Sequence, residues 1–356
     1  MTDRQKKFSG TKDVQPHLLL NVDKLATWME LNVEEFSGPV TVKEFKGGQS
    51  NPTYQLITPG KRYVLRRKPP GTLMPSAHAV DREFRVIDAL GRANFAVPKA
   101  YALCEDADVL GTMFYVMEMV EGRIFWDLSL PDQTPEERAA IYASKLETLA
   151  HLQNINPFDI GLEGFGKTED YMARQIHRWG KIYIASETNK IPLMDKLNDW
   201  LPKHIPGAEE LSIIHGDYRL DNMVCHPTEP KVIAVLDWEL STLGHPLGDF
   251  AYHLAPWLIP NIDERVSSLE GLNLSELGIP TEEEYIEQYC SLTHRDRIDN
   301  LDFYKAYTLW RLAAIYQGIV KRVEDGTAAS TDALTGTEIP EAFAERAWFY
   351  AERSLV

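Results

Sequence analysis

The chain has 356 residues, more than one hydrophobic core usually supports, so we expect two lobes. Its 53 acidic and 37 basic residues give a formal net charge of −16, which argues against general affinity for nucleic acid or for an anionic membrane surface. Apolar residues make up 44% of the chain and charged residues 25%, as in soluble globular proteins.

Targeting and redox features favour the cytoplasm. The N-terminal "MTDRQKKFSGTKDV" lacks the apolar segment of a signal peptide, and no run of about 18 apolar residues occurs. The three cysteines, Cys104, Cys225 and Cys290, are widely spaced and odd in number, so they provide neither a disulfide framework nor a CxxC zinc knuckle. We expect a cytoplasmic protein with no membrane and no nucleic-acid partner; its oligomeric state stays open.

The sequence pattern of the first third of the chain predicts a small sheet with helices. Residues 1–15 are expected to form a poorly ordered tail and residues 16–120 a β-rich lobe. Apolar periodicity predicts helices over 22–36 and 76–93, the second with a buried stripe of Val80, Phe84, Ile87 and Leu90. Short segments rich in β-branched and aromatic residues, bounded by turns, predict antiparallel strands at 40–48, 53–58, 61–67, 96–106 and 112–120.

From about Glu121 the sequence pattern becomes typical of helices. "TPEERAAIYASKLETLAHLQNI" opens with Thr134 as N-cap, Pro135 at the first helical position and Glu137 as the capping-box partner. The segments "YKAYTLWRLAAIYQGIVKRV" and "EAFAERAWFYAERSLV" are also helical. We therefore expect an α+β fold in which residues 121–356 form a mainly helical second lobe.

One group of polar residues has a spacing that indicates a catalytic site. In "HGDYRLDNMVCHP", Asp217 and Asn222 lie five residues apart, and Asp237 follows fifteen residues later, after the apolar run "VIAVL". Phosphoryl transfer needs a carboxylate that orients the acceptor hydroxyl and oxygen ligands that hold Mg²⁺ on the nucleotide phosphates. The pattern predicts Asp217 as the catalytic base and Asn222 and Asp237 as the metal ligands.

The same residues resemble a known family. "HGDYRLDN" and "VLDWE" are similar to the catalytic loop HGDxxxxN and the metal-binding Asp of aminoglycoside phosphotransferase-like and choline kinase-like enzymes, which are relatives of protein kinases. The resemblance extends from about residue 22 onward. It implies a bilobal protein-kinase-like fold and a kinase that uses ATP and Mg²⁺ to phosphorylate a hydroxyl group of a small molecule.

The resemblance also implies a nucleotide site. Alternation along "RYVLRR" puts Val64 and Arg66 on one face of a strand, so Val64 would line the adenine pocket and Arg66 would face the phosphates. Glu83 on the following helix would pair with Arg66. The remaining expected contacts are the covering-loop residues Gly47, Gly48, Ser50 and Asn51, and the backbone of Glu118, Met119 and Val120 at the adenine.

Two departures from the kinase pattern leave an alternative open. Arg66 stands where kinases usually carry Lys, and Arg is a planar, bidentate cation rather than a point charge. The loop with Gly47 and Gly48 lacks a complete GxGxxG. The alternative is a pseudokinase that binds nucleotide or acyl-CoA and regulates fatty-acid oxidation.

A closer resemblance concerns the acceptor. "GGQSNPTY", "YVLRRKPPG" and "SAHAVDREFRV" are similar to the kinase-like module fused to acyl-CoA dehydrogenases in acyl-CoA dehydrogenase family members 10 and 11. This implies a hydroxyacyl-CoA acceptor. Arg219, two residues after the proposed base, agrees with an anionic acceptor, as does the local basic cluster that the segment "KRYVLRRKPPG" forms with Arg82 and Arg85. An aminoglycoside, an aminoalcohol or a sugar remains the alternative acceptor.

Two further residues are expected to support the catalytic loop. His215 is interpreted as a structural histidine that braces the loop, and Asp249 as an acceptor for loop backbone groups. A zinc hydrolase built from His215, Asp217, His226 and Asp237 is a weaker alternative, because these spacings match no common zinc pattern.

Overall fold

The computed structural model describes residues 9–46, 51–69, 79–207, 210–262, 266–327 and 337–355. The chain divides into a first compact unit (Met1–Asp132, Pro157–Phe165, Arg219–Ser241) and a second (Gln133–Asn156, Gly166–Tyr218, Thr242–Val356). The predicted lobes, 16–120 and 121–356, were contiguous, whereas both units are discontinuous. The segment that carries Asn222 and Asp237 belongs with the N-terminal sheet.

The first unit is built on a six-stranded antiparallel sheet with strand order β1-β2-β3-β4-β6-β5. The strands are β1 (Thr11–Lys12), β2 (Thr41–Phe45), β3 (Thr53–Ile57), β4 (Arg62–Arg67), β5 (Ala100–Cys104) and β6 (Phe114–Glu118). The helical elements before β6 are η1 (Pro16–Leu18), α2 (Val22–Asn32), α3 (Val80–Arg92) and α4 (Ala107–Leu110). The predicted order of three strands, a helix and two strands is confirmed for β2 to β6, with the unpredicted short helix α4 between the last two strands.

The expected N-terminal tail is wrong where the structure describes it. Thr11 and Lys12 form β1, which pairs with β2. The backbone N–H and the side-chain amide of Gln15 donate to the Glu44 carboxylate at 3.1 and 2.9 Å. Residues 9–15 therefore join the sheet edge; residues 1–8 lie outside the described residues.

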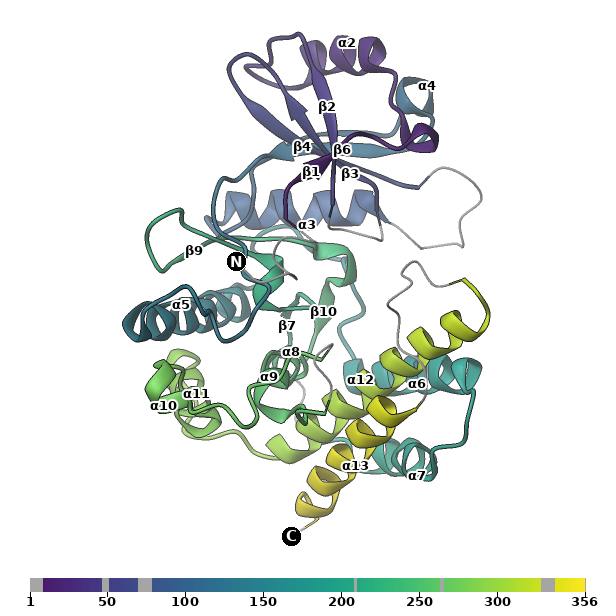
Figure 1. Cartoon of the computed structure of the whole chain (residues 1–356), viewed down its shortest axis with the longest axis vertical. Coiled ribbons are helices and arrows are strands. Elements are labelled where there is room, and N and C mark those ends of the chain that lie inside the picture. Colours follow the sequence, from purple (N-terminus) through teal and green to yellow (C-terminus); the bar gives the residue numbers. More distant parts are fainter. Residues whose placement is uncertain are drawn as a thin grey trace. The chain divides into compact units, whose positions relative to one another are not determined.

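The two faces of this sheet pack on different helices. Tyr63 and Leu65 of β4 belong to a core cluster with Leu25 and Met29 of α2. Arg66, on the alternate face of the strand, pairs with Glu83 of α3. Figure 1 shows α2 and α3 on opposite sides of the sheet. Alternation in β4 thus directs Arg66 away from the apolar core.

Helix α3 differs from its predicted buried stripe at one position. Val80, Ile87 and Leu90 are buried as expected, but Glu83 is only 1% exposed, whereas Phe84 is partly exposed. Phe84 contacts Tyr115 edge-on. Glu83 lies on the inner face because it pairs with Arg66 of the sheet. Apolar periodicity does not detect such an ion pair.

A small hairpin completes the first unit. It consists of β8 (Met223–Cys225) and β9 (Val232–Val235), with the short helices η3 (Leu220–Asn222) and η4 (Trp238–Leu240) flanking it. Arg123 forms a bridge with Cys225, and a Cβ atom at Gly122 would clash with the Cys225 carbonyl oxygen. The segment after β6 is therefore fixed against the hairpin.

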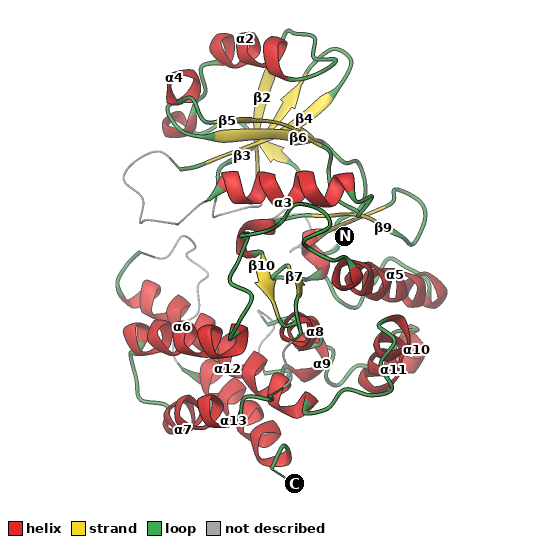
Figure 2. Cartoon of the chain, turned by 180° about the vertical axis from the view of Figure 1, so that it is seen from behind, coloured by secondary structure: helices red, strands yellow, loops and turns green. Residues whose placement is uncertain are grey.

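The second unit is mainly helical (Figure 2). Its elements are α5 (Pro135–Asn154), α6 (Tyr171–Ser186), α7 (Pro192–Trp200), η2 (Leu201–Lys203), α8 (Pro246–His253), α9 (Ala255–Leu258), α10 (Leu274–Leu277), α11 (Glu282–Leu292), α12 (Leu301–Glu324), α13 (Glu338–Arg353), and the strands β7 (Ser212–Ile214) and β10 (Thr242–Gly244). The predicted capping box of Thr134 and Glu137 at the start of α5 is confirmed. Over the described part of the chain, no helix has the length and apolarity that crossing a bilayer requires.

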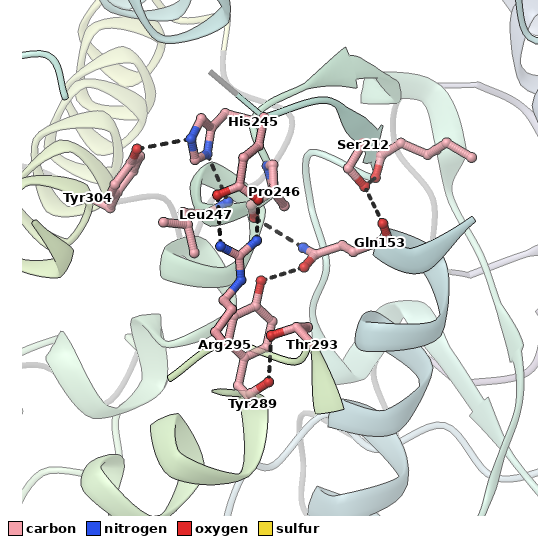
Figure 3. A network of polar contacts seen from close by, with 11 residues as sticks. Gln153, Ser212, His245, Pro246, Leu247, Tyr289, Thr293, Arg295 and Tyr304 are labelled. Atoms are coloured by element: carbon pink, nitrogen blue, oxygen red, sulfur yellow. Dashed lines mark hydrogen bonds and ion pairs between the residues drawn. The ribbon is translucent and has the colours of Figure 1, made fainter. Parts of the chain in front are cut away.

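A polar network inside the second unit ties several elements together (Figure 3). The side-chain carbonyl of Gln153 on α5 accepts from the Tyr289 hydroxyl of α11 at 2.5 Å. Its amide nitrogen donates to the Pro246 carbonyl at the start of α8 at 3.0 Å. The Ser212 hydroxyl of β7 donates to the Gln153 backbone carbonyl at 3.3 Å. One glutamine thus links α5 with α8, α11 and β7.

Candidate active site

The loop after β7 is held by backbone contacts to α8. The N–H groups of His215 and Gly216 donate to the two carboxylate oxygens of Asp249 at 2.7 and 2.9 Å. Burial raises the pKa of Asp249, and His215, these two donors and Arg311 only partly offset that effect. Gly216 has a φ of 85°, a conformation that favours glycine. The Asp249 carboxylate thereby fixes the path of the chain into Asp217.

Asp217 itself has a close partner that the sequence analysis missed. The Tyr252 hydroxyl donates to Asp217 Oδ1 at 2.6 Å. The backbone N–H of Asp217 donates to Nδ1 of the fully buried His215 at 3.2 Å, so this ring braces the loop. Tyr252 lies three residues after Asp249 on α8, and this spacing was a usable signal, because residues i and i+3 share a helix face.

Arg311 on α12 is the second residue that sequence reasoning missed. Its guanidinium donates to the Gly216 carbonyl at 2.7 Å. It also lies over the rings of Tyr252 and Trp179, at 4.6 and 5.1 Å from their centroids. Arg311 is 6% exposed. No local pattern in the sequence marks it, because its partners come from distant segments.

Asn222 and Asp237 lie at one end of the β8–β9 hairpin. Met223 pairs with Val235, and the Leu236 N–H donates to the Asn222 carbonyl at 2.8 Å. Asp237 follows directly with a φ of 65°, which Asp tolerates better than most residues. The hairpin register places Asn222 and Asp237 at the same end of the hairpin, and both side chains carry oxygen atoms of the kind that Mg²⁺ prefers.

The zinc alternative receives no support from the structure. Within the described ranges, no three or more His, Cys, Asp or Glu side chains are grouped to hold a metal ion. The ring of His226 instead accepts the Glu229 N–H at 3.1 Å.

Arg66 is the centre of a charged cluster in the first unit. Its Nε lies 3.3 Å from Glu83 Oε2, and its Nη2 lies 3.0 Å from Asp237 Oδ1 and 3.6 Å from Glu239 Oε2. Asn51 donates to the same Glu239 oxygen at 3.4 Å. Arg66 therefore connects the helix α3 carboxylate to the proposed metal ligand. Glu239 was not among the predicted site residues.

The electrostatics of this cluster follow from burial and from an excess of carboxylates. Burial raises the pKa of Glu83 to about 7, with Arg66 opposing this shift and Asp237 and Glu239 adding to it. Burial disfavours the Arg66 cation, but the surrounding carboxylates outweigh that effect and hold the pKa of Arg66 above its ordinary value. Three carboxylates therefore surround one guanidinium, so the side chains of this cluster carry an excess of acidic groups.

The other residues predicted to bind the nucleotide lie in the sheet, directly after it, or outside the described residues. Val64 is buried and pairs with Met117 in the sheet. Glu118 ends β6, where its carboxylate accepts the Lys99 N–H at 3.2 Å. Met119 and Val120 follow β6 directly. Gly47, Gly48 and Ser50 lie outside the described residues.

Arg82 and Arg85 of the predicted basic cluster both bind the same loop. Arg82 donates to the Phe165 carbonyl at 2.5 Å, and Arg85 donates to the carbonyls of Gly161 and Glu163 at 3.1 and 2.7 Å. These two arginines hold the loop 157–165. The Arg219 side chain is 47% exposed and lies 3.3 Å from Asp221.

Comparison with known proteins identifies the family. Residues 41–278 match the model of the phosphotransferase enzyme family. This chain belongs to that family. Its members transfer a phosphoryl group to a hydroxyl group, and the chain is accordingly a phosphotransferase with an alcohol group as acceptor.

Curated relatives are longer proteins. The chain is 41% identical to acyl-CoA dehydrogenase family member 10 of Mus musculus over 345 residues, which cover 97% of the chain and 32% of the relative. It is 42% identical to acyl-CoA dehydrogenase family member 11 of Homo sapiens over 357 residues, covering 98% and 45%. The phosphotransferase chain thus spans less than half the length of these relatives.

Solved structures confirm the predicted fold class. A putative aminoglycoside phosphotransferase from Ralstonia eutropha matches with a TM-score of 0.86 and 48% identity, over 94% of this chain and 99% of that one. A microcompartment-associated aminopropanol kinase matches with a TM-score of 0.57 and 17% identity, over 94% and 97% of the two chains. The phosphotransferase has the bilobal, protein-kinase-like α+β fold.

Proposed function

We propose that this phosphotransferase is an ATP- and Mg²⁺-dependent kinase of a hydroxylated small molecule. The observation that carries the proposal is the Arg66 cluster, in which one guanidinium contacts both Glu83 and Asp237. Asn222 lies at the same hairpin end as Asp237. A phosphate clamp and an oxygen-rich metal site within one unit are what binding a metal–nucleotide complex requires.

In the proposed reaction the acceptor hydroxyl oxygen forms a bond to the γ-phosphorus. The bond from that phosphorus to the β–γ bridging oxygen breaks, ADP leaves, and the hydroxyl proton passes to Asp217. Arg66 holds the phosphates. Asn222 and Asp237 would hold Mg²⁺, which would supply positive charge to neutralise the phosphate oxygens.

The remaining nucleotide contacts are assigned by the family resemblance. Gly47, Gly48, Ser50 and Asn51 would cover the phosphates, and Val64 with the backbone of Glu118, Met119 and Val120 would meet the adenine. The Asn51 contact to Glu239 supports this assignment, because it ties the end of the covering loop to the Arg66 cluster.

For the acceptor, we propose a neutral or anionic molecule such as a hydroxyacyl-CoA. Trp179 and Tyr252 are aromatic rings in the unit that carries Asp217, and both already face the guanidinium of Arg311. An internal cation there disfavours a polycationic aminoglycoside or a choline-like acceptor. The exposed Arg219 and the names of the curated relatives support the same choice.

A nucleotide- or acyl-CoA-binding pseudokinase is the second candidate. One observation favours it: Nη2 of Arg66 lies 3.0 Å from Asp237, so the cation that replaces Lys already neutralises a proposed metal ligand.

Mass spectrometry of reactions with Mg²⁺-ATP tests the proposal. The acceptor panel contains 3- and 4-hydroxyacyl-CoAs, choline, kanamycin and simple sugars. We expect a hydroxyacyl-CoA product heavier by one phosphate, formed by the wild type and lost in Asp217→Asn. The surface variant Asp195→Asn is the matched control and keeps activity, since Asp195 lies on α7 with its side chain 47% exposed, 3.2 Å from Lys190. Nucleotide binding without product would favour the pseudokinase, and failure to bind nucleotide would overturn the kinase.

A further inference from the structure

The contact between Tyr252 and Asp217 has the geometry of a strong hydrogen bond. The oxygen–oxygen distance is 2.6 Å, within the range of a hydroxyl donating to a carboxylate. Tyr252 is 6% exposed, so little water competes for its hydroxyl. Neither the family match nor the HGDxxxxN pattern assigns a role to this tyrosine.

We propose that Tyr252 is a positioning residue for phosphoryl transfer, whose hydroxyl fixes the rotation of the Asp217 carboxylate and stabilises its ionised form. The inference rests on the proposed function, in which Asp217 orients the acceptor hydroxyl and takes its proton. A base held in one rotamer is ready for the acceptor without the cost of ordering its side chain during the reaction.

Two further residues, Asp249 and Arg311, fix the surroundings of the Asp217–Tyr252 contact. Asp249, one turn earlier on α8, holds the backbone of His215 and Gly216, so a single helix positions both the main chain and the side chain of the base. Arg311 of α12 lies over the Tyr252 ring at 4.6 Å and donates to the Gly216 carbonyl. A cation over the ring face also makes the phenol a better hydrogen-bond donor.

A purely structural tyrosine would affect stability but not proton chemistry. Charged or titratable groups that contact the Asp217 loop or the Tyr252 ring include His215 in the loop, Asp249 on α8 and Arg311 on α12. A donor to the ionised carboxylate favours the charged state of Asp217. Removing the Tyr252 hydroxyl therefore moves the acid limb of the pH–rate profile toward neutral pH, with these other groups unchanged.

The test compares Tyr252→Phe with Tyr289→Phe. Both remove a buried tyrosine hydroxyl from the second unit, and Tyr289 keeps its ring stacked on Phe250 in the control. For Tyr252→Phe we expect kcat to fall roughly ten- to hundredfold while KM for ATP changes by less than about twofold. The acid limb shifts only in this variant. Adding Tyr252→Phe to Asp217→Asn produces no further loss, because the hydroxyl acts through that carboxylate.

A measurement independent of turnover separates this inference from the proposed function. Protein labelled with ¹³C at the aspartate carboxyls is titrated by NMR, with the Asp217 signal assigned by its loss in Asp217→Asn. We expect the Asp217 titration midpoint to move to higher pH in Tyr252→Phe and to stay in place in Tyr289→Phe. An unchanged midpoint would overturn the role of Tyr252 even if the wild type is an active kinase. A shifted midpoint in a protein that phosphorylates no acceptor would retain the contact and reject the kinase.

Discussion

At the scale of single residues, the substitution of Arg for the usual kinase Lys has a geometric reason. The guanidinium presents several donors in a fixed plane, so Arg66 reaches Glu83 through Nε and Asp237 through Nη2 at the same time. A lysine ammonium would be a single point of charge between them. The planar cation thus suits a site that contains three carboxylates rather than one.

The raised pKa of the buried Glu83 carboxyl predicts that the stability of the protein depends on pH. Burial raises the pKa of Glu83 from its ordinary value of 4.5 to about 7. Between these values the folded protein retains a proton that the unfolded chain releases, so the free energy of unfolding falls as pH rises through this window. We expect urea midpoints of the wild type to fall more steeply than those of Glu83→Gln between pH of about 5 and about 7.

The control for that prediction is Glu105→Gln, which changes an exposed glutamate next to α4. It should follow the wild-type slope. Equal slopes for the wild type and Glu83→Gln would show that Glu83 ionises in the folded protein as it does in the unfolded chain.

At the scale of elements, local signals were predictable and tertiary ones were not. The capping box of Thr134 and Glu137 involves only adjacent turns of chain, and the structure has it as predicted. The burial of Glu83 on α3 depends on Arg66 of the sheet, so apolar periodicity did not indicate it, although the family resemblance predicted that the two residues pair. Strand β1 was missed because two residues in a polar stretch carry no periodicity, and their pairing comes from β2.

The candidate site shows the same division. Asp217, Asn222 and Asp237 lie in a motif with fixed spacing, so the sequence alone indicated them as candidate site residues. Arg311 could not, because its contact to the Gly216 carbonyl exists only after α12 packs on α8. The basic cluster was inferred from sequence proximity alone, and Arg82 and Arg85 instead bind carbonyls of the loop 157–165.

The polar network of Figure 3 predicts that the protein loses stability when the Gln153 side chain is removed. Gln153→Ala removes the acceptor of the Tyr289 hydroxyl and the donor to the Pro246 carbonyl. We expect the free energy of unfolding to fall by about 1–3 kcal/mol, the cost of leaving buried polar groups unpaired. Urea denaturation measures it, with the exposed Glu147→Ala on the same helix as the control. Equal stability of both variants would contradict a linking role for Gln153.

At the scale of the whole molecule, the residues proposed as base and as metal ligands fall in different units. Asp217 belongs to the second unit and Asn222 and Asp237 to the first, and the chain passes from one to the other between Tyr218 and Arg219. Nucleotide and metal binding are thereby assigned to one unit and the base to the other. Substitutions in the two units should separate binding from turnover.

Ligand-induced stabilisation tests that separation. A ligand at about 100 times its Kd stabilises the folded protein by about 2.7 kcal/mol. We expect ATP with Mg²⁺ to raise the urea midpoint of the wild type, and EDTA to remove most of that increase. Asp237→Asn should lose the part that depends on Mg²⁺, because it removes a charged oxygen ligand. Asp217→Asn, although inactive, should keep the full increase. A Mg²⁺-dependent increase that survives in Asp237→Asn and disappears in Asp217→Asn would reverse the assignment of metal and base.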